Sequence, residues 1–328
     1  MMEICVLRGE DVRALLPMNE CIALMRTTMI AVSEGRAELP LRSIMAMPGD
    51  IGKMGNMSGF LAEPECYGVK IVSMSPRNIG TSYSSHLGVV LLFETGHGRP
   101  VAFLDAAEIT AIRTAAVSGL ATDLLAHADA GDLAILGAGE QARSHLEAML
   151  AVRPIRRVRV WSHHPEAAAR FAEEQGMRHG ITIDAMTDAA LATAGADLIC
   201  TVSRAHEPVL RNEWVADGAH LNLVGSSIAQ AAEIDTPLVV RARYFVDYQT
   251  STINEAGEYL RALREGAITP DHILGEIGAV ANGSIAGRTG RDDVTLYKSL
   301  GIAAQDLAAA HLVTARAKER GIGQRVEF

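Results

Sequence analysis

A glycine-rich turn between a short apolar run and a helical pattern constrains this chain most. The run at 133–136 is Leu-Ala-Ile-Leu, and the Gly-x-Gly-x-x-Ala turn after it contains Gly137, Ala138, Gly139, Gln141 and Ala142. Gly137 permits a tight turn, Gly139 lets the backbone approach a pyrophosphate, and Ala142 lets the helix pack near the strand. The free N–H groups and positive dipole end of that helix favour phosphates. The pattern predicts dinucleotide binding, and an ordinary glycine turn is the alternative.

The residues after the next predicted strand bear on the choice of dinucleotide. Val158 to Trp161 reads as that strand, and Ser162, His163 and His164 follow it. Enzymes that use NAD usually carry Asp or Glu at this point, roughly 20 residues past the glycines. This chain has neither a carboxylate to repel a 2′-phosphate nor an arginine to bind one. NAD and NADP both remain open, and the two histidines are equally well explained as surface-loop residues.

The order of predicted elements indicates an α/β fold in two parts. The first hundred residues read mostly as β-strands with hairpin spacing, apart from a helix that Pro17 starts and a glycine-rich turn region at 49–59. A long helical pattern at 108–126 leads into alternating strands and helices from 133 to about 250, which is typical of a parallel sheet. We expect 244–248 to be the last strand of that sheet, and 254–264, 273–281 and 301–318 to be helical.

Composition excludes several classes of protein. With 48% hydrophobic and 21% charged residues among 328, the chain is typical of a globular protein, and its net charge of −9 argues against nucleic acid as a partner. Cys5, Cys21, Cys66 and Cys200 are far apart, so we expect reduced thiols, no disulfide framework and no metal site. No signal-peptide core and no membrane-spanning run are seen. We therefore expect a cytoplasmic protein with no membrane partner.

Three basic residues fall where the local pattern predicts burial, namely Arg42, Lys70 and Arg113. A buried cation is costly unless it meets an anion, so each has a structural carboxylate partner or the three bind an anionic ligand together. His86 precedes an apolar strand and reads either as a proton relay or as a hydrogen-bonded structural residue. Four acidic residues are candidate partners for the cations: Asp105, Glu108, Asp293 and Glu255.

These segments together resemble the ornithine cyclodeaminase and mu-crystallin family over nearly the whole chain. The resemblance rests on Arg42, Gly68-Val69-Lys70, His86-Leu87-Gly88, Glu108 to Ala116, Gly137 to Ala142 and Gly218 to Gly225. It implies a homodimer made of a Rossmann NAD(P)-binding domain at 120–301 and a β-rich substrate-binding and dimerisation domain formed by 1–119 and 302–328. It further implies that Arg42, Lys70, His86 and Arg113 bind the substrate. It places the cofactor against Thr114, Gly137, Ala138, Gly139, Gln141, Ala142, Ser162, His163, His164, Thr201, Val202, Ser203, Val224 and Ser299.

One departure from the cyclodeaminases is informative. Those enzymes carry an aspartate just after the Val-Gly stretch, where this chain has Ser226 and Ser227. Without that carboxylate, a diamine substrate loses a counter-charge, so an acidic or neutral substrate is favoured. The serines, with Lys298 to Gly301, resemble the ketimine reductase and mu-crystallin branch.

The leading hypothesis is an NAD(P)H-dependent imine reductase that converts a small α-imino acid to an L-amino acid. Arg113 and Arg42 would hold the substrate carboxylate, Lys70 would supply a proton or positive charge, and Ser227 or a water would assist. Candidate substrates are iminosuccinate, iminopropionate and cyclic imino acids such as Δ1-pyrroline-2-carboxylate. One alternative is an NAD-dependent amino-acid cyclodeaminase or lyase. Another is a non-enzymatic, crystallin-like protein that only binds the cofactor.

Overall fold

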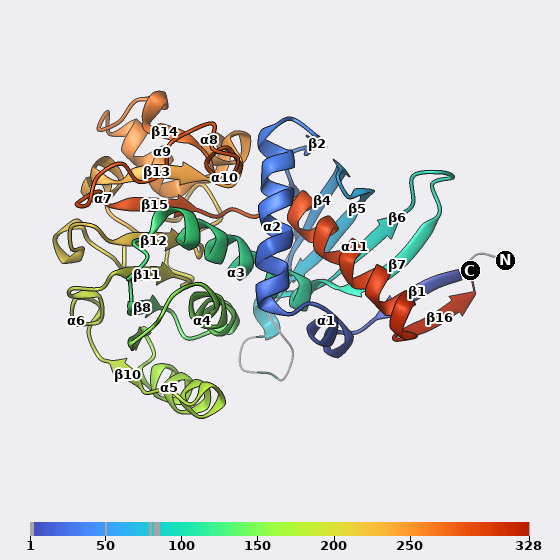
Figure 1. The fold of residues 1–328 in the computed structure, drawn as a ribbon, viewed down its shortest axis with the longest axis horizontal. Helices are drawn as coiled ribbons and strands as arrows, with labels where there is room; N and C mark the ends of the chain where they lie inside the picture. Colours follow the sequence, from blue (N-terminus) through green and yellow to red (C-terminus); the bar gives the residue numbers. More distant parts are fainter. Residues whose placement is uncertain (1–2, 50, 79–80, 82–85, 328) are drawn as a thin grey trace. The chain divides into compact units, whose positions relative to one another are not determined.

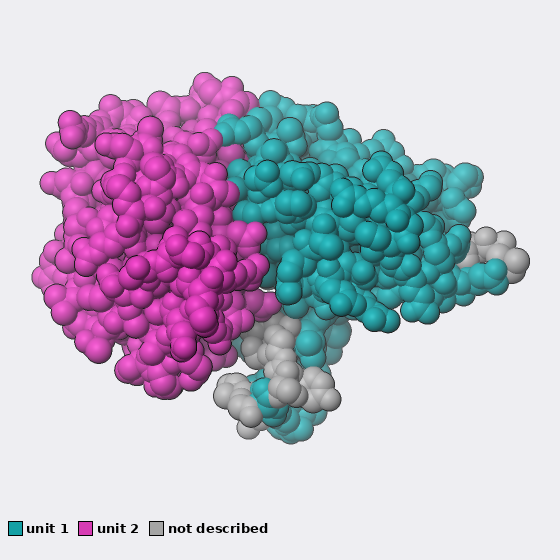
Figure 2. Space-filling model, turned by 60° about the horizontal axis from the view of Figure 1, so that its bottom comes forward, with its two compact units in different colours: residues 1–114, 301–328 teal, residues 115–300 magenta. Residues whose placement is uncertain are grey.

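The chain divides into two compact units, which Figure 2 colours separately. The computed structural model describes all residues except 1–2, 50, 79–80, 82–85 and 328, and the side chain of His86 lies outside the described part as well. The first unit comprises 1–114 and 301–328, and the second comprises 115–300. The α/β class and the split into a β-rich part and a Rossmann-type part are confirmed.

The first unit is built on one mostly antiparallel sheet with the order β16-β1-β7-β6-β5-β4-β2, in which β3 pairs with β4 and only β1 and β7 are parallel. The first and last strands of the described residues, β1 and β16, pair with each other (Figure 1). Its elements are β1 (Glu3–Leu7), α1 (Gly9–Leu15), α2 (Met18–Ser33), β2 (Ala37–Glu38), β3 (Ser43–Met47), β4 (Gly52–Ala62), β5 (Glu65–Met74), the 3₁₀ turn η1 (Pro76–Asn78), β6 (His86–Phe93), β7 (Pro100–Asp105), the first part of α3 (Ala106–Leu125), α11 (Ala303–Arg320) and β16 (Gln324–Glu327).

The prediction of a glycine-rich turn at 49–59 is wrong, because most of it belongs to the eleven-residue strand β4. Its glycines serve close packing. A Cβ at Gly59 would lie 3.0 Å from Cβ of Ala303, and a Cβ at its cross-strand partner Gly68 would lie 2.9 Å from Cδ2 of Leu307. Both contacted residues are on α11, so the glycines let this helix lie close against the sheet.

Helices α2 and α11 run beside each other along one face of this sheet (Figure 1). Side chains alternate between the two faces of a strand. Lys70 on β5 pairs with Val90 on β6, which pairs with Leu104 on β7, and all three are buried on the helix-covered face. The register therefore places a lysine among apolar side chains, as the sequence predicts.

The second unit contains a fully parallel sheet with the order β10-β9-β8-β11-β12-β15-β13-β14. Its elements are the rest of α3, β8 (Asp132–Leu136), α4 (Glu140–Val152), β9 (Arg157–Trp161), α5 (Pro165–His179), β10 (Ile183–Met186), α6 (Ala189–Thr193), β11 (Leu198–Thr201), η2 (Asn212–Trp214), β12 (His220–Leu223), α7 (Thr236–Arg241), β13 (Arg243–Val246), α8 (Gln249–Glu255), α9 (Gly257–Arg264), η3 (Pro270–His272), β14 (Ile273–Glu276), α10 (Ile277–Ala281) and β15 (Thr295–Lys298).

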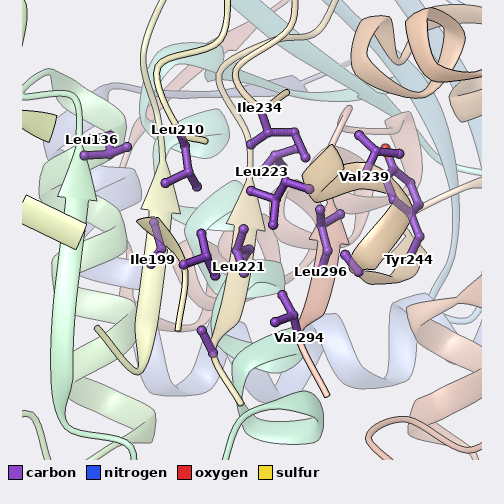
Figure 3. Close-up of a cluster of buried hydrophobic side chains, with 14 of the residues drawn as sticks. Leu136, Ile199, Leu210, Leu221, Leu223, Ile234, Val239, Tyr244, Val294 and Leu296 are labelled. Atoms are coloured by element: carbon purple, nitrogen blue, oxygen red, sulfur yellow. The ribbon is translucent and has the colours of Figure 1, made fainter. Parts of the chain in front are cut away.

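The core of the second unit is aliphatic, with side chains such as Ile199, Leu221 and Leu296 from successive strands in one cluster (Figure 3). Two expectations are corrected here. The segment 244–248 is not the last strand, because β14 lies outside it at the sheet edge and β15 is inserted between β12 and β13. The stretch 273–281 begins as strand β14, since its run of apolar residues satisfies a buried strand as well as a helix.

Among the described residues, no single helix is long and apolar enough to cross a membrane, although α1 and α2 pass that test as a pair bent by 81°. Over the same residues, no group of His, Cys, Asp and Glu side chains is arranged to hold a metal ion. The four cysteines are buried and unpaired.

Candidate active site

In the first unit, one carboxylate joins two of the three predicted cations. Asp306, in the first turn of α11, places Oδ1 2.8 Å from Nε of Arg113 on α3 and Oδ2 2.8 Å from Nζ of Lys70 on β5. Lys70 also donates to the hydroxyl of Thr110, one turn before Arg113 on α3, at 3.3 Å. Side-chain exposure is 5% for Lys70, 4% for Arg113 and 0% for Asp306. Three elements far apart in the sequence therefore meet at one buried cluster.

Burial and nearby charges set the ionisation of this cluster. Burial lowers the pKa of Lys70 to about 8, and the positive charges of Arg113 and Arg42 act in the same direction, against Asp306, which raises it. Burial also works against the charged form of Asp306, but Arg113 and Lys70 outweigh it and hold its pKa below the ordinary value. At neutral pH the cluster contains an ionised carboxylate and a lysine poised to lose its proton.

Arg113 is oriented from two sides. Its Nη1 donates to Oε1 of Gln305 at 2.6 Å, while its Nε is taken by Asp306. Gly301 lies against the guanidinium, and a Cβ added there would come within 2.8 Å of Nη1. Its φ of 79° also favours glycine. These two acceptors engage one N–H at Nε and one at Nη1 of the five N–H donors of the guanidinium.

The remaining predictions for this unit have mixed outcomes. Arg42 lies just before β3, close enough for its charge to lower the pKa of Lys70. His86 begins β6, and its side chain lies outside the described residues. The proposed acidic partners are wrong for Lys70 and Arg113, which pair with Asp306. Asp105 instead accepts from the backbone at the start of α3, Glu108 pairs with Arg13, Asp293 pairs with Arg243, and Glu255 ends α8.

In the second unit, the predicted fingerprint joins β8 to α4. Gly137 has φ of 129°, and a Cβ there would lie 2.8 Å from the carbonyl oxygen of Val202. Gly139 is the N-cap of α4, and a Cβ there would meet nothing within 4 Å, so open space lies over this glycine. Oε1 of Gln141 is buried without a hydrogen-bond partner. Ala142 is fully buried, as close helix–strand packing requires.

The other cofactor candidates of this unit follow the carboxyl ends of neighbouring strands. The sheet order changes direction at β8, which lies between β9 and β11, and ligands of open α/β sheets bind at such a point. The residues placed at these strand ends are Ser162, His163 and His164 after β9, Thr201, Val202 and Ser203 at β11, Val224 after β12, and Ser299 after β15. These placements and the open glycine turn fit a dinucleotide. Thr114, by contrast, lies on α3 in the first unit and is buried.

A buried glutamate that sequence reasoning missed ties two of these strand ends together. Glu233 accepts from the hydroxyl of Thr201 at 2.8 Å and from the N–H and hydroxyl of Ser203 at 2.8 and 2.6 Å. It also accepts from the N–H of Gly225 at 2.7 Å. Burial raises its pKa, opposed by these donors and by Lys298. The hydroxyls of Thr201 and Ser203 are therefore occupied by Glu233.

The loop with the two serines is held by a buried ion pair. Nζ of Lys298, at the end of β15, lies 2.7 Å from Oε1 of Glu258 and donates to the hydroxyl of Ser226 at 2.9 Å. The Ser226 hydroxyl in turn donates to Oε2 of Glu258 at 2.9 Å. Two carboxylates therefore contact this loop, Glu258 at Ser226 and Glu233 at Gly225, and the sequence did not indicate either of them. Ser226 is thus engaged within the loop, and the neighbouring Ser227 is half-buried.

The missed acidic residues carry a recognisable signal. Gln305 and Asp306 are polar residues inside an Ala- and Leu-rich helical run. Lys70 and Arg113 are predicted to be buried because they are charged residues in apolar segments, and the same rule applied to acidic residues identifies Asp306. Glu233 lies in an irregular segment, where no period shows which side chains are buried, whereas Glu258 lies in the predicted helix 254–264 and is buried on α9 beside Tyr259.

Comparisons with known proteins agree with this arrangement. The model of the ornithine cyclodeaminase/mu-crystallin family matches residues 2–321. A Δ1-pyrroline-2-carboxylate reductase of Bacillus cereus is 32% identical over 324 residues, covering 98% of this chain and 99% of its own. The structure of the Thermococcus litoralis enzyme of that name, in complex with NADH and L-proline, has a TM-score of 0.95 at 34% identity, covering 98% of this chain and 100% of its own.

A third similarity is to the iminosuccinate reductase of Paracoccus denitrificans in complex with NAD⁺, with a TM-score of 0.92, 29% identity and full coverage of both chains. The family model covers almost the entire sequence, and the two solved relatives match it from end to end. This chain belongs to the ornithine cyclodeaminase/mu-crystallin family.

Proposed function

We propose that this chain reduces a small α-imino acid to the corresponding L-amino acid, using a nicotinamide dinucleotide. The observation that carries the proposal is the buried cluster of Lys70, Arg113 and Asp306, in which a proton donor lies beside a guanidinium. The family supports this reaction, because similar members are named as reductases of Δ1-pyrroline-2-carboxylate and of iminosuccinate.

Arg113 is proposed to bind the substrate carboxylate, with Arg42 as a second cation. A guanidinium suits a carboxylate because two parallel N–H groups match its two oxygens. Gln305 and Asp306 already accept from Nη1 and Nε, so the guanidinium keeps one orientation before the substrate arrives. This preorganisation reduces the entropy lost on binding.

Lys70 is proposed to protonate the product nitrogen. The imine carbon accepts a hydride, the C=N π pair forms a new N–H bond with a proton from Nζ of Lys70, and Lys70 is left neutral until solvent reprotonates it. Its pKa of about 8 keeps the proton in place near neutral pH yet allows its transfer. A bound nicotinamide dinucleotide supplies the hydride. Ser227 is proposed as an assisting hydrogen-bonding group.

The dinucleotide is proposed to lie along the strand ends of the second unit. The pyrophosphate would lie over Gly139 and the first turn of α4, where a side chain at 139 would meet nothing within 4 Å. Its adenosine ribose would approach Ser162, His163 and His164 after β9. The two solved relatives described above contain NADH and NAD⁺, so NADH is the first cofactor to test, with NADPH beside it.

A reductive assay tests the function. The protein is mixed with NADH or NADPH and with Δ1-pyrroline-2-carboxylate, or with oxaloacetate or pyruvate plus ammonia, and absorbance of the reduced nicotinamide is followed. Lys70→Met should lower turnover by about 100-fold or more, since general acid catalysis contributes roughly 10²–10⁴-fold. Lys53→Met is the matched control, because Lys53 is exposed on β4. Dinucleotide binding without oxidation by any of these imines would refute the proposal.

We also propose that the chain forms a homodimer through the sheet face that its helices leave open. Val69, Leu91 and Phe103 lie side by side on β5, β6 and β7, and Phe103 is 41% exposed. Tyr67 and Phe93 stack on the same face at 5.4 Å. An apolar sheet face of this kind marks an interaction site, and a second copy offers a matching surface.

The unpaired cysteines support a reducing, cytoplasmic setting.

A further inference from the structure

Lysine is rare in this chain, and its placement is selective. Lysine and arginine together number 30, yet Lys53, Lys70, Lys298 and Lys318 are the only lysines in the sequence. Two of them are buried, with side-chain exposures of 5% for Lys70 and 0% for Lys298. Each is paired with a buried carboxylate, Asp306 in the first unit and Glu258 in the second. Half of the lysines of this chain are therefore buried against a carboxylate, in surroundings to which the pKa of a lysine responds.

We propose that Asp306 is the positioning residue of the candidate active site: it holds the Lys70 ammonium and the Arg113 guanidinium in one fixed arrangement and is the counter-charge that they share. This inference deepens the proposed function and rests on it for the roles of the two cations. Asp306 touches neither substrate nor hydride in this scheme, and it acts through its two partners.

The geometry assigns the role to Asp306 because its two oxygens are divided between the two cations. Oδ1 lies 2.8 Å from Nε of Arg113, and Oδ2 lies 2.8 Å from Nζ of Lys70. The Nε edge of the guanidinium is therefore used for positioning. Gln305, one residue earlier in α11, adds the contact to Nη1 at 2.6 Å. The first turn of α11 thus sets both the separation and the relative orientation of the two cations.

The charges around Lys70 explain why the carboxylate is needed there. Arg113 from α3 and Arg42 from the segment before β3 both lower its pKa, and burial lowers it further. Thr110 contributes only a neutral hydroxyl. Asp306 from α11 is the group that acts in the opposite direction. Removing its charge should leave Lys70 neutral over a wider range of pH.

A titration that does not depend on turnover tests this. Lysine labelled with ¹³C gives one set of side-chain signals from each of the four lysines, assigned by substitution, and the ¹³Cε shift reports protonation. In Asp306→Asn the titration of Lys70 should move down by about 1 pH unit or more, since an opposite charge within about 4–6 Å shifts a pKa by 1–3 units. The Lys298 signals should stay unchanged. Glu319→Gln, the same change at an exposed position of α11, should leave Lys70 as in the wild type.

Kinetics with the imino acid then separate positioning from charge. Asp306→Glu keeps the charge but moves the carboxylate by one methylene. The pH at which the rate of reduction falls should therefore stay near its wild-type value, while the KM for the imino acid rises about tenfold or more. Gln305→Met removes the contact to Arg113, together with the contact of the Gln305 amide nitrogen to Sδ of Met29, and should raise KM without moving the titration of Lys70. Asp306→Glu also serves if Asp306→Asn does not fold.

Each outcome has one meaning. An unchanged Lys70 titration in folded Asp306→Asn, or wild-type kcat and KM in Asp306→Glu, would overturn the positioning role. If no imino acid is turned over but the titration shifts as expected, the proposed function fails while the link between Asp306 and Lys70 stands.

Discussion

Lys70, Arg113 and Asp306 bring two positive charges and one negative charge into a volume from which water is nearly excluded. A buried ion pair contributes little net stability, because desolvation offsets most of its attraction, but a buried cation without a partner destabilises the fold strongly. One carboxylate shared by two cations leaves a residual positive charge. A carboxylate-bearing ligand would neutralise that charge, so we expect the cluster to bind an anion.

The pH dependence of the reaction follows from Lys70. In the proposed mechanism, reduction needs the ammonium form of Lys70, so the rate of reduction should fall as pH rises through about 8. Oxidation of the amino acid needs the neutral amine of Lys70, so the rate of oxidation should rise over the same range. Rates measured in both directions across pH check this. The activity that remains in Lys70→Met should not show this change in rate near pH 8. A reduction rate that stays flat up to the ordinary lysine value of 10.5 would contradict the assignment.

Strand ends position the candidate dinucleotide-binding residues of the second unit. Parallel strands bring their carboxyl ends to one edge, but each loop there still needs its own support. Glu233 supplies it for the segments after β11 and β12, since it accepts hydrogen bonds from both. A Cβ at Gly225 would lie 2.0 Å from the carbonyl oxygen of Ser203, so the two segments are also in direct contact.

Glu233→Gln tests this support. A glutamine amide can accept at one atom only, so at least one buried donor among those facing Glu233 is left unsatisfied, which costs about 1–3 kcal/mol. We expect a lower free energy of unfolding and weaker dinucleotide binding, measured by denaturant titration and by calorimetry. Glu207→Gln, at an exposed carboxylate on the same unit, is the control. If Glu233→Gln binds the dinucleotide with wild-type affinity, the segments after β11 and β12 keep their positions without Glu233.

The two glycines of the fingerprint should separate stability from binding. Gly137→Ala introduces a Cβ 2.8 Å from the carbonyl oxygen of Val202 and forces a φ of 129°, so it should lower both the melting temperature and the affinity for the dinucleotide. Gly139→Ala has open space around its Cβ and should weaken dinucleotide binding alone. Equal affinities for the two variants and the wild type would place the pyrophosphate elsewhere.

At the scale of the whole molecule, the open face of the first sheet predicts self-association. Phe103→Glu places a charge in the apolar row with Val69 and Leu91, and it should convert the proposed dimer to monomers in sedimentation or light-scattering measurements. Met177→Glu makes a comparable change on α5, where the side chain is 73% exposed, and should leave the assembly unchanged. A Phe103→Glu protein of wild-type mass would show that a different surface is used.

Much of the fold is predictable from the sequence because periodicity and glycine chemistry are local signals. The turn at Gly137 and the buried position of Lys70 are of this kind. The glycines of β4 are misleading as a turn signal, since Gly59 allows the approach of α11, which lies more than two hundred residues away. Asp306 meets Lys70 across a similar separation, and no local pattern specifies which acid pairs with which base.

The first unit is made from two separate segments, 1–114 and 301–328, and this affects the order in which the units form on the ribosome. Residues 115–300 emerge as one continuous block and can fold while synthesis continues. Lys70 and Arg113 have been synthesised by then, but Asp306 has not. Until 301–328 leave the exit tunnel, these cations lack their counter-charge and β1 lacks its partner β16. The nascent chain therefore has its parallel sheet well before the cluster of Lys70, Arg113 and Asp306 is complete.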